Sequence, residues 1–318
     1  MKKKLSLLLC TLVAALTVGC GSGQTTNPVV SEVETNKEPL KIGLISSIAS
    51  LPILIAQEQG YFDEANLEVE LEYFKAAKDR DAALQAGTLD GVLCDQIAIS
   101  IYQNADIDMQ ITGKTDGSTT IVAGPNSGVE KVEDLVGKKI AISENTMIEY
   151  TLDQVLASAG IECSAVEKVS IPSMATRLEM LQSGEIDAAV MPNPYSDTAL
   201  ANGCKSIEVV DSTSDLYISV TAFKKDILDV HQDTIKKYYE AYDRAVEYIN
   251  ATDVSVYENV IIDTIGYPET MRGNMVIPRF NKNVLPSEAS VTSAFAWATE
   301  KGLLTKALSP SDVLVSIQ

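Results

Sequence analysis

The chain has 318 residues, of which 22% are charged, and its formal net charge is −19 at pH 7. Acidic residues outnumber basic residues by 44 to 25, which argues against electrostatic binding to nucleic acid or to anionic lipid. About 280 residues follow the N-terminal segments, which is enough for two lobes of ordinary size.

The first twenty residues have the features of an export signal. Residues 2–4 are lysines, and residues 5–18 carry no charge. This apolar stretch is too short to cross a bilayer, which needs roughly 20 residues, so we interpret it as a signal peptide over residues 1–19 rather than an anchor. Residues 16–20 (LTVGC) resemble a bacterial lipobox, although Thr17 departs from the aliphatic residue preferred there. We therefore expect lipidation at Cys20, with ordinary secretion as the alternative.

Residues 20–39 are rich in Gly, Ser, Thr, Asn, Pro and charged residues and contain few apolar ones. This composition predicts a flexible tether with a root-mean-square span of roughly 25 Å. The tether would hold the folded part away from the membrane. We expect the protein on the outer face of the cytoplasmic membrane, or in the periplasm of a cell with two membranes.

From residue 40 onward, short apolar runs alternate with helical patterns, and the series restarts near residue 132. Strands are expected at 40–45, 67–74, 91–94, 109–112, 119–123, 139–142, 167–171, 186–191 and 207–210. Strands that alternate with helices predict mostly parallel sheets with right-handed crossovers. After a further strand at 216–222 the chain is mainly helical, and we expect this tail to pack on the first lobe.

The expected fold is therefore α/β with two lobes, each a mostly parallel sheet flanked by helices. Lobe 1 is predicted to comprise residues 40–123 and 217–318, and lobe 2 residues 124–216. The chain would cross between the lobes near 124–126 and again near 211–215. Both segments are rich in Gly, Pro, Asn, Ser or Asp, as linkers tend to be.

Cysteine and histidine usage argues against a metal site or a cofactor. Apart from Cys20, the mature chain contains Cys94, Cys163 and Cys204, with no CxxC or Cys/His spacing. A bridge between Cys163 and Cys204 and a set of free thiols are both compatible with the sequence. His231 is the sole histidine and lies among polar residues near a predicted helix start, where we expect a solvated side chain.

Five stretches resemble, in order and spacing, the solute-binding proteins of ABC importers for sulfonates, nitrate, taurine and thiamine-precursor pyrimidines. They are 56–62 (AQEQGYF), 83–90 (ALQAGTLD), 132–142 (VEDLVGKKIAI), 181–188 (LQSGEIDA) and 297–303 (WATEKGL). The resemblance implies the type II periplasmic-binding-protein fold, with two lobes joined by two hinge crossings and the ligand held between them. We interpret the glycines and aspartates of these motifs as structural.

Ligands of open α/β sheets lie beyond the carboxyl ends of the strands, where helix N-termini point. The residues expected to bind the ligand on this basis are Ser46, Ser47, Phe74, Lys75, Asp95, Glu144, Asn145, Thr146 and Asn193. Tyr217 is the tenth expected ligand contact, because its ring could stack on the ligand. The family commonly has an aromatic residue and an acid before the proline at 194, where this chain has Pro192 and Asn193. Phe74, Tyr195 and Tyr217 are then the candidates for a stacking ring.

The charges near these strand ends point to different ligands. Lys75, Lys78 and Arg80 would favour an anion such as a sulfonate or carboxylate. Glu144 and Glu149 flank a predicted helix start and would accept bonds from an amino group. Together they suit a zwitterion or an aminopyrimidine better than nitrate. The alternative is that the acids complement the helix dipole and the lysines are solvated.

We therefore expect a monomeric binding protein without catalytic residues, which captures a small molecule for an ABC permease and its ATPase. It would contact the membrane through its lipid anchor only and bind no nucleic acid. One rival is an enzyme similar to the thiamine-pyrimidine synthases, which need a reactive histidine and a Cys-rich run that this chain lacks. The other is a lipoprotein sensor domain of the same fold.

Overall fold

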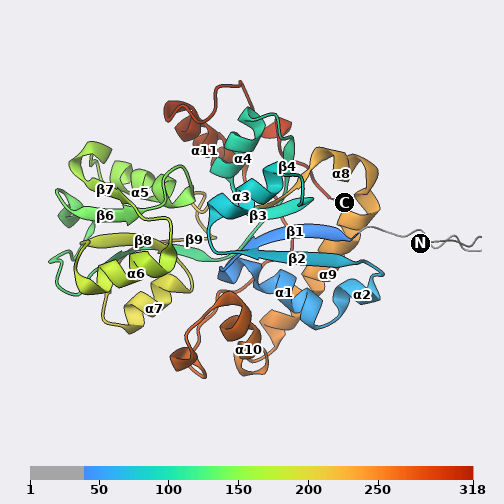
Figure 1. The fold of residues 1–318 in the computed structure, drawn as a ribbon, viewed down its shortest axis with the longest axis horizontal. Helices are drawn as coiled ribbons and strands as arrows, with labels where there is room; N and C mark the ends of the chain where they lie inside the picture. Colours follow the sequence, from blue (N-terminus) through green and yellow to red (C-terminus); the bar gives the residue numbers. More distant parts are fainter. Residues whose placement is uncertain (1–38, 318) are drawn as a thin grey trace, which may run out of the picture. The chain divides into compact units, whose positions relative to one another are not determined.

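The computed structural model describes residues 39–317, which form two five-stranded sheets with flanking helices (Figure 1). The predicted signal peptide, Cys20 and nearly all of the predicted tether lie outside the described residues. Residues 39–317 belong to one compact unit. We call the first sheet with its helices lobe 1 and the second sheet with its helices lobe 2.

The sheet of lobe 1 has the strand order β2-β1-β3-β10-β4. Its first three strands run parallel, while β10 is antiparallel to both β3 and β4. The strands are β1 (Leu40–Ile45), β2 (Val69–Phe74), β3 (Gly91–Asp95), β4 (Met109–Lys114) and β10 (Ser219–Lys224). One face packs on α1 (Leu51–Glu58) and α9 (Gln232–Ala251), next to α2 (Tyr61–Glu64). The other face packs on α3 (Ala77–Gln85), α4 (Gln96–Asn104) and α11 (Glu288–Glu300).

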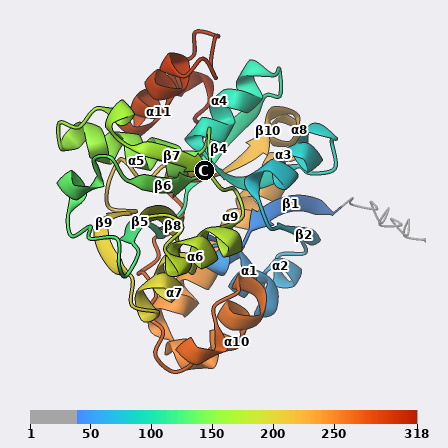
Figure 2. The ribbon, with the colours of Figure 1, turned by 60° about the vertical axis from the view of Figure 1, so that its left-hand side comes forward.

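The sheet of lobe 2 repeats this arrangement with the order β7-β6-β8-β5-β9. Its strands are β5 (Ser118–Ala123), β6 (Lys139–Ile142), β7 (Glu167–Ser170), β8 (Ala188–Pro192) and β9 (Lys205–Asp211). Figure 2 shows α5 (Met147–Ser158) on one face, with α6 (Met174–Ser183) and α7 (Tyr195–Ala201) on the other. The predicted two-lobe α/β fold is therefore confirmed.

The chain crosses between the lobes at residues 115–117 and 212–218. The first crossing differs from the prediction, which put residues 118–123 in lobe 1 and the crossing near 124–126. The structure places β5 in the second sheet, antiparallel to β8 and β9. A short apolar run predicts a strand, but its pairing partners are distant in sequence, so the pattern alone does not indicate which sheet it joins.

The two lobes also repeat the contacts at the start of their central strands. Asp90 follows α3 and accepts a hydrogen bond of 2.9 Å from the amide of Lys41 on β1. Asp187 follows α6 and accepts a hydrogen bond of 2.9 Å from the amide of Lys139 on β6. These aspartates of the repeated LQxGxxD pattern join a helix–strand turn to the neighbouring strand, so their structural interpretation is confirmed.

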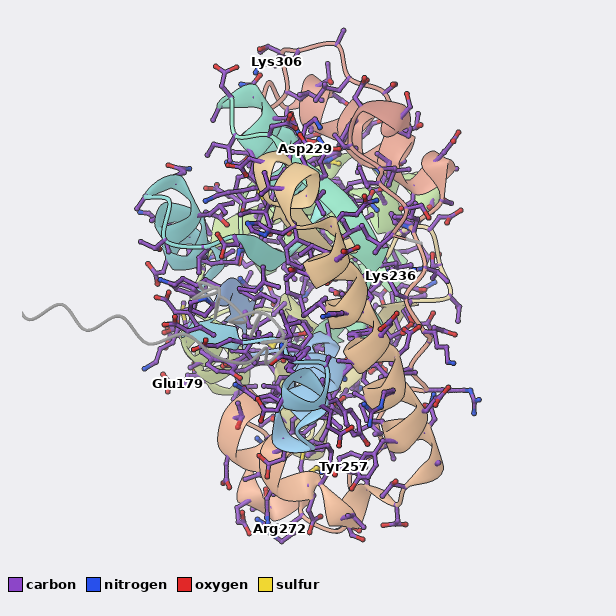
Figure 3. The ribbon with its side chains drawn as sticks, turned by 90° about the vertical axis from the view of Figure 1, so that its right-hand side faces the viewer. Glu179, Asp229, Lys236, Tyr257, Arg272 and Lys306 are labelled. Atoms are coloured by element: carbon purple, nitrogen blue, oxygen red, sulfur yellow. The ribbon has the colours of Figure 1, made fainter. Side chains whose placement is uncertain are left out.

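Helix α9 is the longest described helix, with 20 residues, and covers one face of the lobe 1 sheet. Its buried side includes the predicted stripe of Ile235, Tyr238, Tyr242, Ala245 and Ile249. Lys236 lies on its exposed side (Figure 3). Such an amphipathic helix is stabilised mainly by tertiary packing. Within residues 39–317, no helix is both long enough and apolar enough to cross a membrane.

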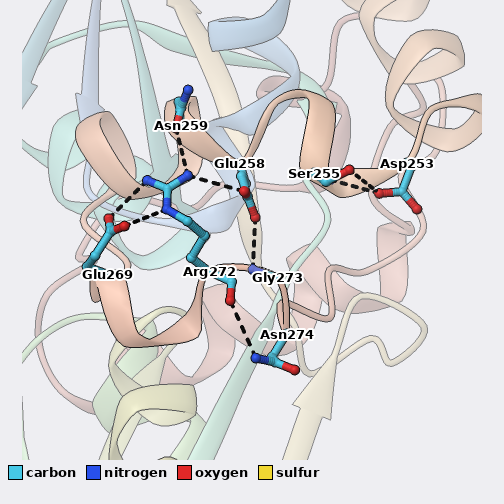
Figure 4. Close-up of polar contacts among 8 residues, drawn as sticks. All are labelled: Asp253, Ser255, Glu258, Asn259, Glu269, Arg272, Gly273 and Asn274. Carbon is cyan, nitrogen blue, oxygen red and sulfur yellow. Dashed lines mark hydrogen bonds and ion pairs between the residues drawn. The ribbon is translucent and has the colours of Figure 1, made fainter.

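A network around Arg272 stabilises the segment after α9 (Figure 4). The guanidinium donates to Glu269 at 2.9 Å and to Glu258 at 3.2 Å, on either side of the loop that carries Tyr267. The hydroxyl of Tyr267 in turn donates to Asp197 of α7, in lobe 2, at 2.9 Å. This segment of lobe 1 therefore makes a direct contact with lobe 2.

Candidate ligand-binding site

A cavity of about 700 Å³ lies between the two lobes, within the size range of small-molecule sites. Lobe 1 contributes the carboxyl ends of β1, β2 and β3 and the residues that follow them, including Ser46, Lys75 and Asp95. Lobe 2 contributes the segments after β6, β7 and β8, including Ser143 and Tyr195. The cavity therefore lies at the carboxyl ends of the parallel strands of both sheets.

Eight of the ten predicted binding residues line this cavity, namely Ser46, Ser47, Lys75, Asp95, Glu144, Asn145, Thr146 and Tyr217. Phe74 and Asn193 are not among the lining residues. Phe74 packs against the core of lobe 1. The side-chain amide of Asn193 is bonded within lobe 2. Its Oδ1 accepts from the Ser118 hydroxyl at 2.5 Å, and its Nδ2 donates to Asp197 at 2.7 Å.

The prediction missed Thr119 and Ser219, which also line the cavity. Both lie at the start of a strand, Thr119 on β5 and Ser219 on β10. Because these strands are antiparallel to their neighbours, their N-terminal ends lie at the edge where the parallel strands end. A search for polar residues after strands does not find them, and no other local signal in the sequence marks them.

The basic residues expected to attract an anion differ in whether their charge is free to contact a ligand. Lys75 and Lys78 line the cavity with exposed side chains. Arg80 is buried and forms an ion pair of 2.7 Å with Asp81, and it also donates to the carbonyl of Leu93 at 2.8 Å. The charge of Arg80 is therefore compensated within lobe 1, contrary to its expected role as a free cation.

Asp95 connects the two lobes at the cavity wall. It ends β3, caps α4 by accepting from the Ala98 amide at 2.8 Å, and accepts from the Met147 amide of α5 at 3.3 Å. The residue is only 6% exposed. Burial raises the pKa of Asp95 above its ordinary value, although the two amides favour the charged form.

The start of α5 differs in detail from the prediction, in which Asn145 caps the helix. Thr146 is the cap, and its hydroxyl accepts from the Ile148 amide at 3.2 Å. Asn145 adopts a left-handed conformation with φ 60°, and its amide donates to Glu149 at 2.9 Å. The Asn145 side chain remains exposed at the cavity.

Glu149 does not line the cavity, although it was expected to face a ligand. It is 2% exposed and accepts from Lys168 at 3.0 Å and from Lys301 of lobe 1 at 2.6 Å. Burial would raise the pKa of Glu149, but the bonds from Lys301, the Asn145 amide and Lys168 outweigh it and lower the pKa. Glu149 therefore belongs to a second contact between the lobes.

Two aromatic residues line the cavity, Tyr195 at the start of α7 and Tyr217 in the second crossing. Tyr217 is 4% exposed and packs over Gly117 in the first crossing. Gly117 has φ +154°, and a Cβ there would lie 2.5 Å from the hydroxyl oxygen of Tyr217. The two crossings therefore contact each other at a position that requires glycine.

Cys94, Cys163 and Cys204 are free thiols in the structure, so the bridge considered between Cys163 and Cys204 is not formed. Across residues 39–317, no group of three or more His, Cys, Asp or Glu side chains is arranged to hold a metal ion. His231 lies exposed at the junction of α8 (Lys225–Val230) and α9, near the predicted helix start.

The family model described as NMT1/THI5 like matches residues 47–253, more than half of the chain. The chain belongs to the NMT1/THI5-like family. This NMT1/THI5-like protein is 27% identical over 300 residues to a candidate aliphatic sulfonates-binding protein of Bacillus subtilis (strain 168), with 87% of each chain covered. It is 25% identical over 250 residues to the taurine-binding periplasmic protein of Escherichia coli (strain K12), covering 77% of this chain and 73% of the relative.

Solved structures of other proteins share the fold of this NMT1/THI5-like chain. The periplasmic aliphatic sulphonate binding protein SsuA from Escherichia coli superposes with a TM-score of 0.74 at 20% identity, covering 87% of this chain and 97% of SsuA. The desulfurization enzyme DSZB superposes with a TM-score of 0.62 at 15% identity, covering 88% of this chain and 97% of DSZB. The fold is thus shared by binding proteins and by an enzyme, and the fold alone does not indicate the activity.

Proposed function

We propose that this protein is the extracytoplasmic solute-binding component of an ABC importer, which captures a small organic molecule between its lobes. The observation that carries the proposal is the cavity of about 700 Å³, which is lined by strand ends of both lobes. A molecule held there contacts both lobes at once and favours the conformation in which they are close together. A permease and its ATPase would then recognise the closed form.

The ligand contacts are proposed to come from the polar residues that line the cavity in both lobes. Lobe 1 offers Ser46, Ser47 and Lys75, and lobe 2 offers Asn145 and Thr146. Tyr195 and Tyr217 remain candidate stacking rings, whereas Phe74 does not line the cavity. Two strand-to-strand crossings at residues 115–117 and 212–218 are the proposed hinges, with lobe 2 extending from β5 to β9.

Binding without chemistry is supported over the enzyme alternative by two observations. Both curated relatives named above are described as binding proteins. The sole histidine of the chain, His231, lies outside the residues that line the cavity. An enzyme similar to the thiamine-pyrimidine synthases would need a reactive histidine near its substrate.

The proposal includes lipid anchoring through Cys20, supported by the lipobox-like residues 16–20 and by the uncharged stretch before them. The protein would act as a monomer on the outer face of the cytoplasmic membrane, or in the periplasm where there are two membranes. The net charge of −19 supports a membrane contact through the lipid alone, because anionic lipid would repel the folded part.

The test is to identify the ligand and then to measure closure. Small molecules released from the purified, denatured protein are identified by mass spectrometry, and the refolded ligand-free protein is titrated with them. A compound that binds the refolded protein and reduces its radius of gyration in X-ray scattering, without changing helix content, supports the proposal. The proposal is wrong if no released molecule and no member of a broad metabolite library binds.

A further inference from the structure

Two arginines occupy equivalent positions in the two lobes. Arg80 on α3 is 1% exposed, and Arg177 on α6 is 0% exposed. Each precedes an LQxGxxD motif and donates from Nη1 to the carbonyl oxygen of the residue 13 positions later. These bonds are 2.8 Å from Arg80 to Leu93 on β3 and 2.5 Å from Arg177 to Val190 on β8.

The two arginines differ in how their charge is compensated. Arg80 is followed by Asp81, whose carboxylate lies 2.7 Å from Nη2. The corresponding neighbour of Arg177 is Leu178, and no carboxylate within residues 39–317 lies at ion-pair distance from Arg177. Arg177 donates instead to neutral oxygens, including the carbonyl of Ile171 at 2.6 Å. Burial lowers the pKa of Arg177 to about 9, so it is still charged at neutral pH.

A buried charge without a counter-ion is strongly unfavourable. One hydrogen bond connects the guanidinium of Arg177 to a residue of the cavity wall. Its Nη2 donates to Oγ of Ser143 at 2.6 Å. Ser143 follows β6 and lines the cavity. A hydroxyl that accepts from a cation keeps its own proton for another acceptor, and the cation makes that proton a stronger donor. Within the described chain, Ser143 Oγ has no acceptor for that proton.

A second donor lies in the same wall of the cavity. Thr119 is 0% exposed and lines the cavity, and its Oγ1 has no hydrogen-bond partner among residues 39–317. Its equivalent in lobe 1 is Ser219, since Thr119 pairs with Pro192 on β8 and Ser219 pairs with Asp95 on β3. Ser219 is satisfied, because it accepts from Thr115 at 2.7 Å and donates to the Cys94 carbonyl at 3.3 Å.

In lobe 1, Arg80 has a counter-ion and the hydroxyl of Ser219 has hydrogen-bond partners. Within the described residues of lobe 2, Arg177 has no counter-ion and Thr119 Oγ1 has no partner. The acidic residues that line the cavity are Asp81, Asp95 and Glu144, and none of them pairs with Arg177. Asp81 pairs with Arg80, and Asp95 accepts from two backbone amides. We propose, on the basis of the proposed binding function, that Arg177 is the counter-ion of an acidic group of the ligand, a carboxylate, sulfonate or phosphonate, which accepts from Ser143 and Thr119. Arg177 acts through Ser143 and is a specificity-determining residue of lobe 2.

The test compares acids with neutral molecules of the same shape. Ethanesulfonate and propionate are titrated by calorimetry beside ethanesulfonamide, propionamide and propylamine, and the ratio of acid to amide affinity is recorded. The wild-type protein is expected to bind the acids at least about tenfold more tightly than the amides, which corresponds to one charge-assisted hydrogen bond. Arg177→Met should reduce this ratio to near one, and Arg177→Lys should restore part of it.

Arg177→Met replaces a buried side chain and its hydrogen bonds, which destabilises the fold. Ser143→Ala is therefore the second variant. It keeps the arginine and should lower the acid-to-amide ratio by about tenfold, whereas Ser183→Ala, at the exposed end of α6, should leave the ratio unchanged. A merely structural role for Arg177 would lower stability without changing the ratio.

The outcomes separate this inference from the proposed function. If amides or the amine bind as tightly as the acids and close the lobes, the protein is a binding protein but Arg177 is not a counter-ion. If the acids bind and the ratio survives in both Arg177→Met and Ser143→Ala, the inference is likewise wrong. If no compound of any class binds and none co-purifies, the proposed function itself fails.

Discussion

The amide of Met147, at the start of α5 in lobe 2, donates a hydrogen bond of 3.3 Å to Oδ2 of Asp95 at the end of β3 in lobe 1. The other oxygen of this carboxylate caps α4 by accepting from the Ala98 amide at 2.8 Å. One side chain thus stabilises a helix start and a contact between lobes. This arrangement allows the two roles to be separated by mutation.

Asp95→Asn should shift the ligand-free protein toward an open conformation. The asparagine oxygen still caps α4, but its amide group is a donor that faces the Met147 amide, so the bond between lobes is lost. A loss on the order of 1 kcal/mol changes the ratio of open to closed protein about fivefold. X-ray scattering of the ligand-free variant should give a larger radius of gyration, while Asp79→Asn, an exposed acid of α3, should not. Identical scattering curves for wild type and Asp95→Asn would show that the bond does not hold the lobes together.

Glu149→Gln should remove a pH-dependent part of the stability. The pKa of Glu149 is lowered in the folded protein, so the unfolded chain binds more protons as the pH falls. The stabilisation is present above the ordinary glutamate pKa of about 4.3 and is lost as the pH falls below it. The free energy of unfolding should be lower in the variant at pH 7, and the difference should shrink below about pH 4. In urea unfolding from pH 3 to 8, Glu144→Gln serves as the control, because Glu144 is an exposed acid in the loop just before α5. A difference that stays constant with pH contradicts the ion pairs with Lys168 and Lys301.

Gly117→Ala should destabilise the protein and disturb Tyr217. The added Cβ would lie 2.5 Å from the Tyr217 hydroxyl oxygen, and the φ of +154° is unfavourable for alanine. Strain of this kind costs roughly 1–3 kcal/mol in the free energy of unfolding. Gly128→Ala is the matched control, because Gly128 has φ +72° but nothing lies within 4 Å of its added Cβ. Equal losses in the two variants would mean that backbone strain alone, and not contact with Tyr217, accounts for the effect.

Cys20→Ser should abolish lipidation, since the thiol of Cys20 is the expected acceptor of the lipid. The variant should accumulate unprocessed or be released, and it should not incorporate radioactive palmitate. Cys10→Ser, within the same apolar stretch, should be labelled and processed like the wild type. Continued labelling of Cys20→Ser would rule out the lipobox interpretation of residues 16–20.

Several features of the fold were predictable because they depend on residues that are close in the chain. The stripe of α9 from Ile235 to Ile249 follows from helical periodicity, and all its predicted members are buried. The aspartates Asp90 and Asp187 follow a helix and a glycine in both lobes, and both accept from a neighbouring strand as such turns do. Polar residues at the ends of parallel strands indicated seven residues of the cavity wall, and Tyr217 was expected there for its aromatic ring.

The alternation of strands and helices follows from the sequence, because hydrophobic periodicity and turn residues act over a few positions. The sheet that β5 joins depends on the tertiary structure, because its partners β8 and β9 are more than 60 residues away and an apolar run pairs equally well with either sheet. The tertiary structure also decided that Thr119 faces the cavity, since this depends on the antiparallel direction of β5. The charge of Arg80 is compensated by its neighbour Asp81, whereas within residues 39–317 the partners of Arg177 are neutral oxygens. That difference arises from which side chains the fold brings within a few ångströms of each guanidinium.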